Sequence, residues 1–437
     1  MAERDGCPGR TDVSGATVPG PAAAADGHAA RPGPVDPDGL IDRAAEVLEG
    51  HWRPPGFCVP NAATYPWQWL WDSCFHAVCW ARLGRADRAR TELANALRHQ
   101  SGDGFVPHIT YWSSRSAPPR ADDDTHAAFW GRPATSSITQ PPMYGHAVAE
   151  LVRRGVDVEP ELVDRAARGL RFLLEARTRD GVGPLIVHPW ESGCDDSPRW
   201  DGWGDFDPAL PDGRVPRWRQ TKGDLVAALR PAVEVAPDRS GAGSASVVAS
   251  TAFEVVAAGF TALVAFNAAE LAEVTGQAAL GEAAAGLAAA LDARWSASRA
   301  TWLDRVVTGP SSTSGVRTLD ALLPVLVSQD PAAVDVAFAQ LADPEAFGAD
   351  CGPTGVDRRE PTFDPRTYWR GPAWPQLTYL LWVAAQRRGR RADADRLAAA
   401  LTTGAVRSGL AEYWDPDTGQ GLGAVPQSWA ALAAVVV

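Results

Sequence analysis

From Leu40 onward, apolar residues recur along the chain at the three- and four-residue spacing of amphipathic helices. Strict alternation of apolar and polar residues, which is typical of half-buried strands, does not dominate any of these segments. The pattern therefore predicts a helical protein. The predicted helices span residues 39–50, 71–83, 86–99, 141–154, 160–178, 249–275, 277–294, 318–328, 331–343, 373–388, 391–404 and 427–437.

Short connections join some neighbouring helices, such as 71–83 with 86–99 and 373–388 with 391–404, so these pairs should run antiparallel. Longer segments separate the pairs and hold most of the Trp, Pro, Gly, His and Asp residues, a composition suited to functional loops. These segments are residues 51–70, 101–140, 180–220, 344–372 and 406–426. Helix pairs with long decorated loops at one end predict an all-α fold, an (α/α)6 barrel over residues 39–437. A superhelical repeat array is disfavoured because no self-similarity at a fixed period occurs.

Residues 1–38 are rich in Pro, Gly, Ala and Asp and contain almost no large apolar side chains. Such a segment cannot bury enough apolar surface to offset the entropy of ordering, so a disordered N-terminal tail is predicted. The N-terminus lacks the apolar stretch of a signal peptide, and no apolar run of about 20 residues follows. We therefore expect a cytoplasmic protein with no membrane partner.

The charge balance narrows the set of partners. With 53 acidic residues against 41 lysines and arginines, the net charge is −12 and argues against binding nucleic acid. Lys222 is the only lysine, which a coding bias towards arginine explains. The six cysteines are scattered without CxxC spacing, and no HxxxH or HExxH occurs, so neither a metal site nor a disulfide framework is predicted. A homo-oligomer is left open.

Two acidic clusters lie in aromatic surroundings, far apart in the sequence. The first holds four carboxylates, Glu191, Asp195, Asp196 and Asp201, in a segment that also contains two tryptophans, Trp190 and Trp200. The second runs over residues 412–419 with the sequence EYWDPDTG. Charges gathered in this way cost free energy unless the protein uses them. Two carboxyl groups acting on one bond are typical of glycoside hydrolysis.

Within the first cluster, partial desolvation and repulsion between neighbouring carboxylates should raise a carboxyl pKa, as a general acid requires. Position alone does not choose among the four carboxylates. Asp196 also fits a helix or turn cap, and Asp201 fits an ion pair with Arg199. In the second cluster, Asp415 and Asp417 should shape a Pro- and Gly-containing turn or bind an ion.

Aromatic residues gather just before two predicted helices, in the segments YPWQWLWDS (65–73) and YWRGPAWP (368–375). Sugar rings stack on aromatic faces and demand planar hydrogen bonding, so a saccharide pocket needs this mixture of aromatic and polar side chains. The alternative for each residue is structural. Trp69 and Trp374 would then pack the core, and Asp72 or Ser73 would cap a helix.

Five motifs in order resemble those of the glycoside hydrolase clan that contains trehalases and family 63 enzymes. They are WLWDSCFHA, ITQPPMYGHA, HPWESGCDDSPRWD, DPRTYWRGPAWPQL and EYWDPDTGQGLG, and they fall between about residues 65 and 430. The chain is most similar to the compact bacterial glucosylglycerate and mannosylglycerate hydrolases of family 63. The resemblance implies an (α/α)6 barrel, an inverting mechanism and no cofactor.

Carried over residue by residue, the resemblance implies that Asp195 is the general acid and Glu412 the general base that activates water. It also implies a glucose subsite lined by Trp69, Trp71, Asp72, Gln140, Tyr368, Trp369, Gly371 and Trp374. Contacts to the leaving group are implied for Tyr65, His108 and Gln427.

With the resemblance, these observations lead us to expect an inverting α-glycoside hydrolase that acts on 2-O-α-glucosylglycerate first and mannosylglycerate second. A charged leaving group needs a cation, for which Arg217 is the candidate and Arg219 the reserve. Inversion requires the carboxyl groups of Asp195 and Glu412 to lie about 6.5 to 9.5 Å apart. The alternatives are a trehalase or an oligosaccharide α-glucosidase of the same fold and, from another class, a noncatalytic sugar-binding protein.

Overall fold

The fold is described from a computed structural model. It describes residues 37–112, 126, 128–132, 134–203, 217–229, 246–309 and 315–437. Residues 1–36, nearly all of the predicted disordered tail, lie outside the described residues. Within the described ranges, no helix is both long and apolar enough to cross a membrane.

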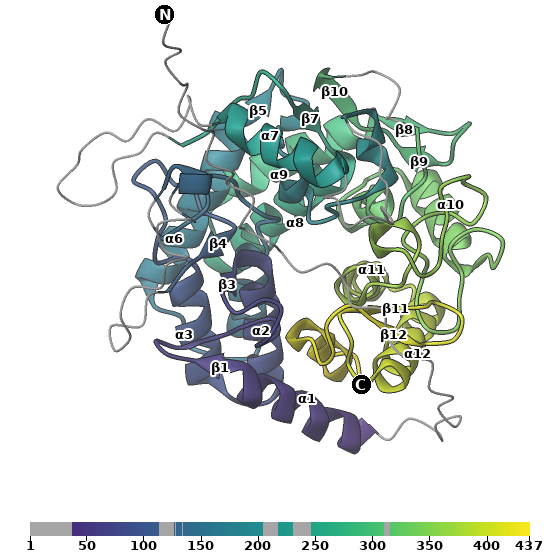
Figure 1. The fold of residues 1–437 in the computed structure, drawn as a ribbon, viewed down its shortest axis with the longest axis horizontal. Helices are drawn as coiled ribbons and strands as arrows, with labels where there is room; N and C mark the ends of the chain where they lie inside the picture. The colour runs from purple at the N-terminus through teal and green to yellow at the C-terminus, as the bar shows by residue number, and fades with distance from the viewer. Residues whose placement is uncertain are drawn as a thin grey trace, which may run out of the picture.

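An inner set of helical elements forms a closed ring of neighbours in chain order (Figure 1). Each element contacts the next, and the last, η8, contacts the first, α2. The inner elements are α2 (Leu70–Arg82), α5 (Tyr144–Arg153), α8 (Ala258–Thr275), the 3-10 helix η6 (Asp320–Leu326), α11 (Pro375–Arg387) and the 3-10 helix η8 (Ser428–Ala434). The chain thus returns at its C-terminus to the helix that follows its first loop.

An outer element packs against each inner one: α1 on η8, α3 on α2, α6 on α5, α9 on α8, α10 on η6 and α12 on α11. The pairs α2 with α3 and α11 with α12 are in contact, as the short connections predict. The outer helices are α1 (Pro37–His51), α3 (Ala86–Ala96), α6 (Pro160–Arg171), α9 (Ala278–Asp292), α10 (Pro331–Ala342) and α12 (Arg391–Ser408). A π-helical turn, η1 (Phe172–Ala176), extends α6.

The difference between inner and outer positions follows from the sequence of each helix. In α8, apolar side chains such as Phe260, Leu263 and Phe266 point to several sides of the helix, and all are buried. Such a helix must be surrounded by other elements, as α8 is by α5, α9 and η6. In α6, by contrast, Leu162 and Leu170 are buried, whereas other positions carry Arg and Glu. That amphipathic pattern places α6 on the outside.

Three predicted helices differ from the structure. The one predicted over 249–275 begins at Ala258, because residues Glu254–Val256 form strand β7, which pairs with β10 (Arg305–Thr308). The segments predicted at 318–328 and 427–437 are the short 3-10 helices η6 and η8, and η6 contains Pro324, which has no N–H to donate. A helix that was not predicted, α7 (Arg217–Leu229), follows the first acidic cluster.

The long segments between helices contain short antiparallel strand pairs and 3-10 turns within a helix-rich fold. The pairs are β1 (Trp52–Arg53) with β2 (Phe57–Cys58), β3 (Gln68–Trp69) with β4 (Ile109–Thr110), β5 (Thr178–Arg179) with β6 (Gly183–Pro184), β8 (Trp295–Ser296) with β9 (Thr301–Trp302), and β11 (Tyr413–Trp414) with β12 (Gly421–Leu422). The 3-10 turns are η2 (Pro189–Ser192), η3 (Pro198–Trp203) and η7 (Tyr368–Arg370).

Helix α2 begins without a side-chain cap, which corrects the expectation for Asp72 and Ser73. Its N-cap residue is Trp69, and Asp72 lies inside the first turn. The Ser73 hydroxyl instead donates to the buried carboxylate of Glu92 at 2.8 Å. Asp72 therefore does not cap the helix, and its side chain lies in the first turn of α2.

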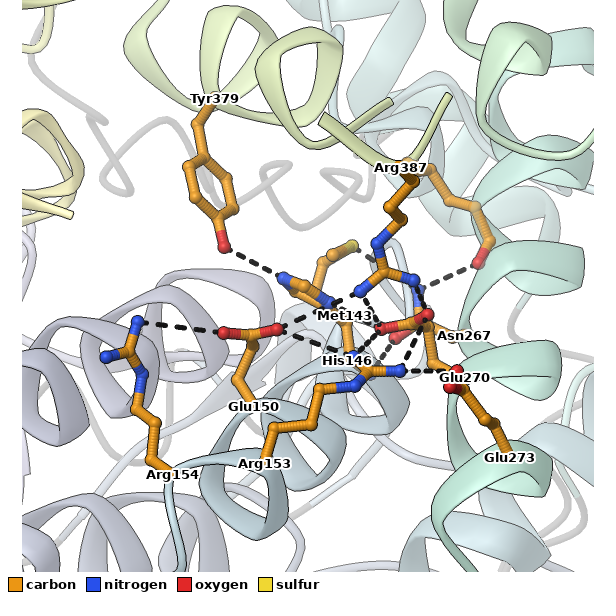
Figure 2. A network of polar contacts seen from close by, with 11 residues as sticks. Met143, His146, Glu150, Arg153, Arg154, Asn267, Glu270, Glu273, Tyr379 and Arg387 are labelled. Carbon is orange, nitrogen blue, oxygen red and sulfur yellow. Dashed lines mark hydrogen bonds and ion pairs between the residues drawn. The ribbon is translucent and has the colours of Figure 1, made fainter. Parts of the chain in front are cut away.

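A buried polar network joins α5, α8 and α11 (Figure 2). The Glu270 carboxylate accepts hydrogen bonds from Arg153 and Arg387, both at 2.6 Å, and lies 3.1 Å from Nδ1 of His146. The other ring nitrogen of His146 lies 2.9 Å from the Tyr379 hydroxyl. Arg153, Glu270 and Arg387 come from the C-terminal halves of their helices, whereas the predicted site residues precede or begin the inner helices. The network therefore marks the end of the fold opposite the predicted site.

Candidate active site

The structure separates the four carboxylates of the first acidic cluster by their partners. Glu191 is fully buried and pairs with Arg177 through two hydrogen bonds of 2.9 and 3.0 Å. Asp201 forms two hydrogen bonds of 2.6 Å with Arg370. These two carboxylates hold structure together and are unsuited to proton transfer.

The expectation for the partner of Asp201 needs correction. The Asp196 carboxylate forms an ion pair with the ammonium of Lys222. Asp201 does not pair with Arg199, whose guanidinium instead contacts Asp304 and Asp320. Sequence proximity suggested the wrong partner, since Asp304 lies more than a hundred positions further along the chain.

Asp195 differs from the other three in that its carboxylate meets a hydroxyl group. The Tyr368 hydroxyl donates a long hydrogen bond of 3.4 Å to Asp195 Oδ2. Burial raises the pKa of Asp195 to about 6, although Lys222 and the Tyr368 hydrogen bond lower it in part. Gly193, two residues earlier, has φ 76° and lies where a Cβ would meet the Trp71 ring at 2.7 Å. The turn that presents Asp195 therefore requires glycine at that position.

Glu412 is held by two donors, one to each carboxylate oxygen. The Tyr65 hydroxyl donates to Oε1 at 2.9 Å, and the Ala424 backbone N–H donates to Oε2 at 3.0 Å. Burial raises the pKa of Glu412 to about 7, and both hydrogen bonds oppose that rise. Repulsion from the charge of Asp195 raises the Glu412 pKa by a smaller amount, so the two carboxyl groups interact electrostatically.

Asp72 also belongs to this electrostatic environment. Its side chain is buried in the first turn of α2, and burial raises its pKa well above the ordinary aspartate value. Glu412, Glu92 and Asp195 raise the pKa of Asp72 further by repulsion. Carboxyl groups from three different motifs thus lie close enough to influence one another.

Aromatic rings connect the motif around Tyr368 to the one around Glu412. Trp369 stacks on Trp374 with ring centroids 3.5 Å apart, and Trp374 stacks on Tyr413 at 4.5 Å. Tyr368 contacts both Trp374 and Tyr413 edge-on. Trp374 itself is fully buried, so its ring packs the core, whereas Tyr368 is partly exposed beside Asp195.

A second group of aromatic residues surrounds Tyr65. The Trp69 ring contacts Tyr65 and His108 edge-on, with centroids 5.8 and 5.3 Å apart. His108 is buried, and its Nδ1 lies 2.6 Å from the Ser136 hydroxyl. The side chain of Gln140 accepts a hydrogen bond from the Trp71 backbone N–H, and the Trp71 ring is buried against Trp429.

Several predicted site residues carry buried polar atoms without a hydrogen-bond partner in the described part of the chain. These atoms are Nε1 of Trp69, Trp369 and Trp374 and Oε1 of Gln427. Leaving such a group unpaired costs about 1–3 kcal/mol. These four atoms comprise three donors and one acceptor.

The chain was compared with known protein families and solved structures. Residues 65–430 match the family described as mannosylglycerate hydrolase MGH1-like glycoside hydrolase domain. The matched range contains both carboxyl clusters and every aromatic motif described above. The chain belongs to this family of glycoside hydrolases. It is therefore an enzyme of glycoside hydrolase family 63, as the motifs predict.

Individual relatives of the hydrolase match over almost their whole length. A mannosylglycerate hydrolase from Thermus thermophilus is 32% identical, over 90% of this chain and 99% of the relative. A glucosylglycerate hydrolase from Mycolicibacterium hassiacum is 29% identical, over 91% of this chain and 97% of the relative. A crystal structure of a family 63 mannosylglycerate hydrolase from a second strain of Thermus thermophilus, in complex with Tris and D-glycerate, is also similar. The match covers 91% of the present chain and 99% of the crystallised chain, with a TM-score of 0.75 and 29% identity.

Three predicted residues contribute less to this description. The side chains of Arg217 and Arg219 lie outside the described residues, although α7 begins at Arg217. Gly371 approaches the backbone of Asp364 so closely that a Cβ would collide with the Asp364 carbonyl group. Its role in the hydrolase is to let the chain pass this point, directly after Arg370.

Among the described residues, two groups of side chains have metal-ligand chemistry, but protein partners already bind their central carboxylates. Glu270, in the group with His146 and Glu150, accepts from the two guanidiniums shown in Figure 2. Glu92, in the group with Cys58 and His76, accepts from the Cys58 backbone N–H and the Ser73 hydroxyl. Asp415 accepts from two backbone N–H groups of its own turn and so shapes that turn. These carboxylates serve the fold.

The sequence interpretation missed two features of the site. The Ala424 N–H that holds Glu412 follows Gly423, which has φ 69° and brings the backbone against the carboxylate. Lys222 contacts the segment that carries Asp195, from a helix that was not predicted. The sequence could have drawn attention to Lys222, because it is the single lysine of the chain.

Proposed function

We propose that the hydrolase cleaves 2-O-α-glycosides of glycerate with inversion, glucosylglycerate first and mannosylglycerate second. Relatives named for each of these two activities match nearly full length with similar identity, which supports the substrate class. The solved relative with bound Tris and D-glycerate supports glycerate as the leaving group. The trehalase and oligosaccharide α-glucosidase alternatives have no comparable support.

The observation that carries the proposal is the pair of carboxyl groups, Asp195 and Glu412. They come from different motifs, each is held by a tyrosine, and burial raises their pKa values to about 6 and about 7. Both therefore titrate close to neutrality, where one can give a proton while the other takes one. The other carboxylates of the first acidic cluster are committed to Arg177, Lys222 and Arg370.

In the proposed reaction, Glu412 removes a proton from a water molecule, whose oxygen attacks the anomeric carbon from the face opposite the leaving group. Asp195 gives its proton to the glycosidic oxygen as the bond between that oxygen and the anomeric carbon breaks. Glycerate leaves with its hydroxyl restored, and the sugar carries the new hydroxyl in the opposite configuration. The hydrogen bond from Tyr368 then stabilises the Asp195 carboxylate that has formed.

The binding residues are proposed in the same roles as in the sequence interpretation, with one addition. The aromatic residues near Asp195 and the unpaired Nε1 atoms support a glucose subsite. Gln427 offers an unpaired acceptor, and its backbone N–H donates to the carbonyl of Leu410, two positions before Glu412. Arg217 begins the helix that contacts the acid segment. Tyr65 was expected at the leaving group, and its hydrogen bond to Glu412 supports an additional role in positioning the base.

We also propose that the fold is an (α/α)6 barrel. The closed ring of inner contacts, with an outer element packed on each member, supports this architecture. In such a ring the loops that precede the inner helices meet at one end. The segments with Tyr65, Asp195, Tyr368 and Glu412 are loops of this kind.

A panel of α-glucosides and α-mannosides, assayed by released sugar, tests the proposal. Glucosylglycerate and mannosylglycerate should be hydrolysed with higher kcat/KM than trehalose, maltose and methyl α-glucoside. If trehalose or maltose is the better substrate, the glycerate proposal fails and the corresponding alternative replaces it.

A further inference from the structure

Lys222 is the single lysine of the hydrolase, and it lies buried against the segment that carries Asp195. Its ammonium forms an ion pair with the Asp196 carboxylate and donates a hydrogen bond of 2.6 Å to the backbone carbonyl of Asp195. One side chain thus holds two consecutive residues of the acid segment. A buried ammonium in this place carries a desolvation cost that a surface lysine would not.

Helix α7 is tied to the acid segment at a second point. The Lys222 carbonyl lies 3.2 Å from Nε2 of His188, and Nδ1 of the same ring accepts from the Trp190 backbone N–H. Because a carbonyl only accepts, these two contacts fix neutral His188 with its proton on Nε2. Trp200 donates to the Cys194 carbonyl from the other side of Asp195. The backbone around Asp195 is therefore held on both sides, with its carboxyl group turned to Tyr368.

The choice of lysine at this position has a physical reason. A coding bias makes arginine the default cation of this chain, so an exception indicates a place that arginine does not fit. An ammonium is compact and directs three donors tetrahedrally, which suits a carbonyl and a carboxylate on adjacent residues. A planar guanidinium is larger and matches the two oxygens of one carboxylate instead, as Arg370 does with Asp201.

We propose that Lys222 is the positioning residue of the general acid: its ammonium fixes the Asp195–Asp196 segment and places a positive charge beside the carboxylate that forms when Asp195 gives up its proton. The inference rests on the proposed role of Asp195. The ammonium of Lys222 contacts the Asp195 carbonyl and the Asp196 carboxylate, so we place it as a residue that acts through the acid segment and not as a catalytic residue.

The charges around this pair are consistent with that role. Lys222 lowers the pKa of Asp195. Burial lowers the pKa of Lys222 to about 7; the charge of Asp195 opposes this shift, and that of Arg370 adds to it. Arg370 is itself paired with Asp201, and Asp196 is the ion-pair partner of Lys222. Across the site, the Tyr368 hydroxyl donates to the Asp195 carboxylate, and the charge of Asp195 raises the pKa of Glu412.

The test compares two substrates that differ in their need for an acid. Glycerate leaves as a strongly basic alkoxide unless it is protonated, whereas fluoride leaves α-glucosyl fluoride without a proton. In Lys222→Met, kcat for glucosylglycerate should fall at least about 10-fold, since a small misplacement of a catalytic group costs up to about 100-fold. The kcat for α-glucosyl fluoride should fall by less than about 3-fold, because general acid catalysis contributes little to that step.

Two variants separate positioning from loss of structure. Lys222→Met leaves Asp196 buried without its cation, so the double variant Lys222→Met/Asp196→Asn removes both charges and should show the same preference for the fluoride. Glu270→Gln disturbs a buried ion pair at the opposite end of the fold and should leave the ratio of the two rates unchanged. Equal losses on both substrates in the lysine variants, or no loss, would overturn the proposal.

A measurement without substrate tests the contact itself. Enzyme labelled with 15N-lysine gives one side-chain signal, because Lys222 is the only lysine. Its titration should lie near the value of about 7 that burial produces, and Asp195→Asn should move it to lower pH. An ordinary lysine titration, or no response to Asp195→Asn, contradicts the proposal. If Asp195→Asn itself spares hydrolysis of glucosylglycerate, the assignment of the acid fails instead, whatever Lys222 does.

Discussion

Replacing Tyr65 with Phe isolates one hydrogen bond to the proposed base. The Tyr65 hydroxyl donates to Oε1 of Glu412 at 2.9 Å, and phenylalanine retains the ring that contacts Trp69. The Ala424 N–H remains on the other oxygen. The substitution therefore changes the ionisation of Glu412 with little change in packing.

The size and sign of the effect follow from this contact. A hydrogen bond to a charged acceptor contributes about 1.5–3 kcal/mol, and one pKa unit corresponds to about 1.4 kcal/mol, so the Glu412 pKa should rise by roughly 1–2 units. That pKa already stands at about 7 because of burial. Glu412 must be ionised to accept a proton from water. Below its pKa, the ionised fraction and hence kcat/KM should fall roughly 10- to 100-fold in Tyr65→Phe.

The assay is the pH dependence of kcat/KM for glucosylglycerate in wild type and Tyr65→Phe. The loss should extend from acid pH up to the pKa of the variant and disappear well above it, because only there is Glu412 ionised in both proteins. Removing a contact to the leaving group would instead lower kcat/KM by the same factor at every pH. A uniform loss, or an unchanged acid limb, would refute a role for Tyr65 in holding the base.

Further predictions concern the acid, the base, the leaving group and the far end of the fold. Asp195→Asn and Glu412→Gln should each lower kcat at least about 100-fold with little change in KM, and near-normal turnover in either variant would exclude that residue. Wild-type kcat/KM should be bell-shaped with limbs near pH 6 and 7, because the two carboxyl groups have those pKa values, and a profile that does not fall on both sides of this range would contradict their roles. Arg217→Ala or Gln427→Ala should raise KM for glucosylglycerate more than for methyl α-glucoside, and equal rises would remove the charged-leaving-group argument. Glu270→Gln should lower the free energy of unfolding in urea by about 3 kcal/mol, at the low end for a broken buried pair because both guanidiniums are partly exposed, and a stable variant would show that the network contributes little.

Helix positions were predictable from sequence because they depend on local spacing. Residues 391–404 and 86–99, for example, lie over α12 and α3 to within a few residues at their ends. The errors arose where the local pattern was ambiguous. Phe253, Val255 and Val256 suit a buried helix or a buried strand equally, and only the pairing of β7 with β10 decides for a strand.

Partners of charged residues were not predictable from spacing, because they come from distant parts of the chain. Asp201 and Arg370 are 169 positions apart, and Tyr65 and Glu412 are 347 apart. Spacing also left four candidates for the acid, and only the motif resemblance singled out Asp195. The structure supplies the physical distinction that the sequence lacked, since cations occupy the other three carboxylates.

The stereochemistry of hydrolysis tests the central claim most directly. If Glu412 activates a water that attacks opposite the glycerate protonated by Asp195, the sugar must first appear with inverted configuration. Proton NMR during the first moments of glucosylglycerate hydrolysis, before the anomers equilibrate, distinguishes the two outcomes. We predict that β-glucose appears first and that α-glucose follows only by mutarotation. Initial release of α-glucose would contradict the account, because retention requires a covalent intermediate and carboxyl groups about 5 Å apart.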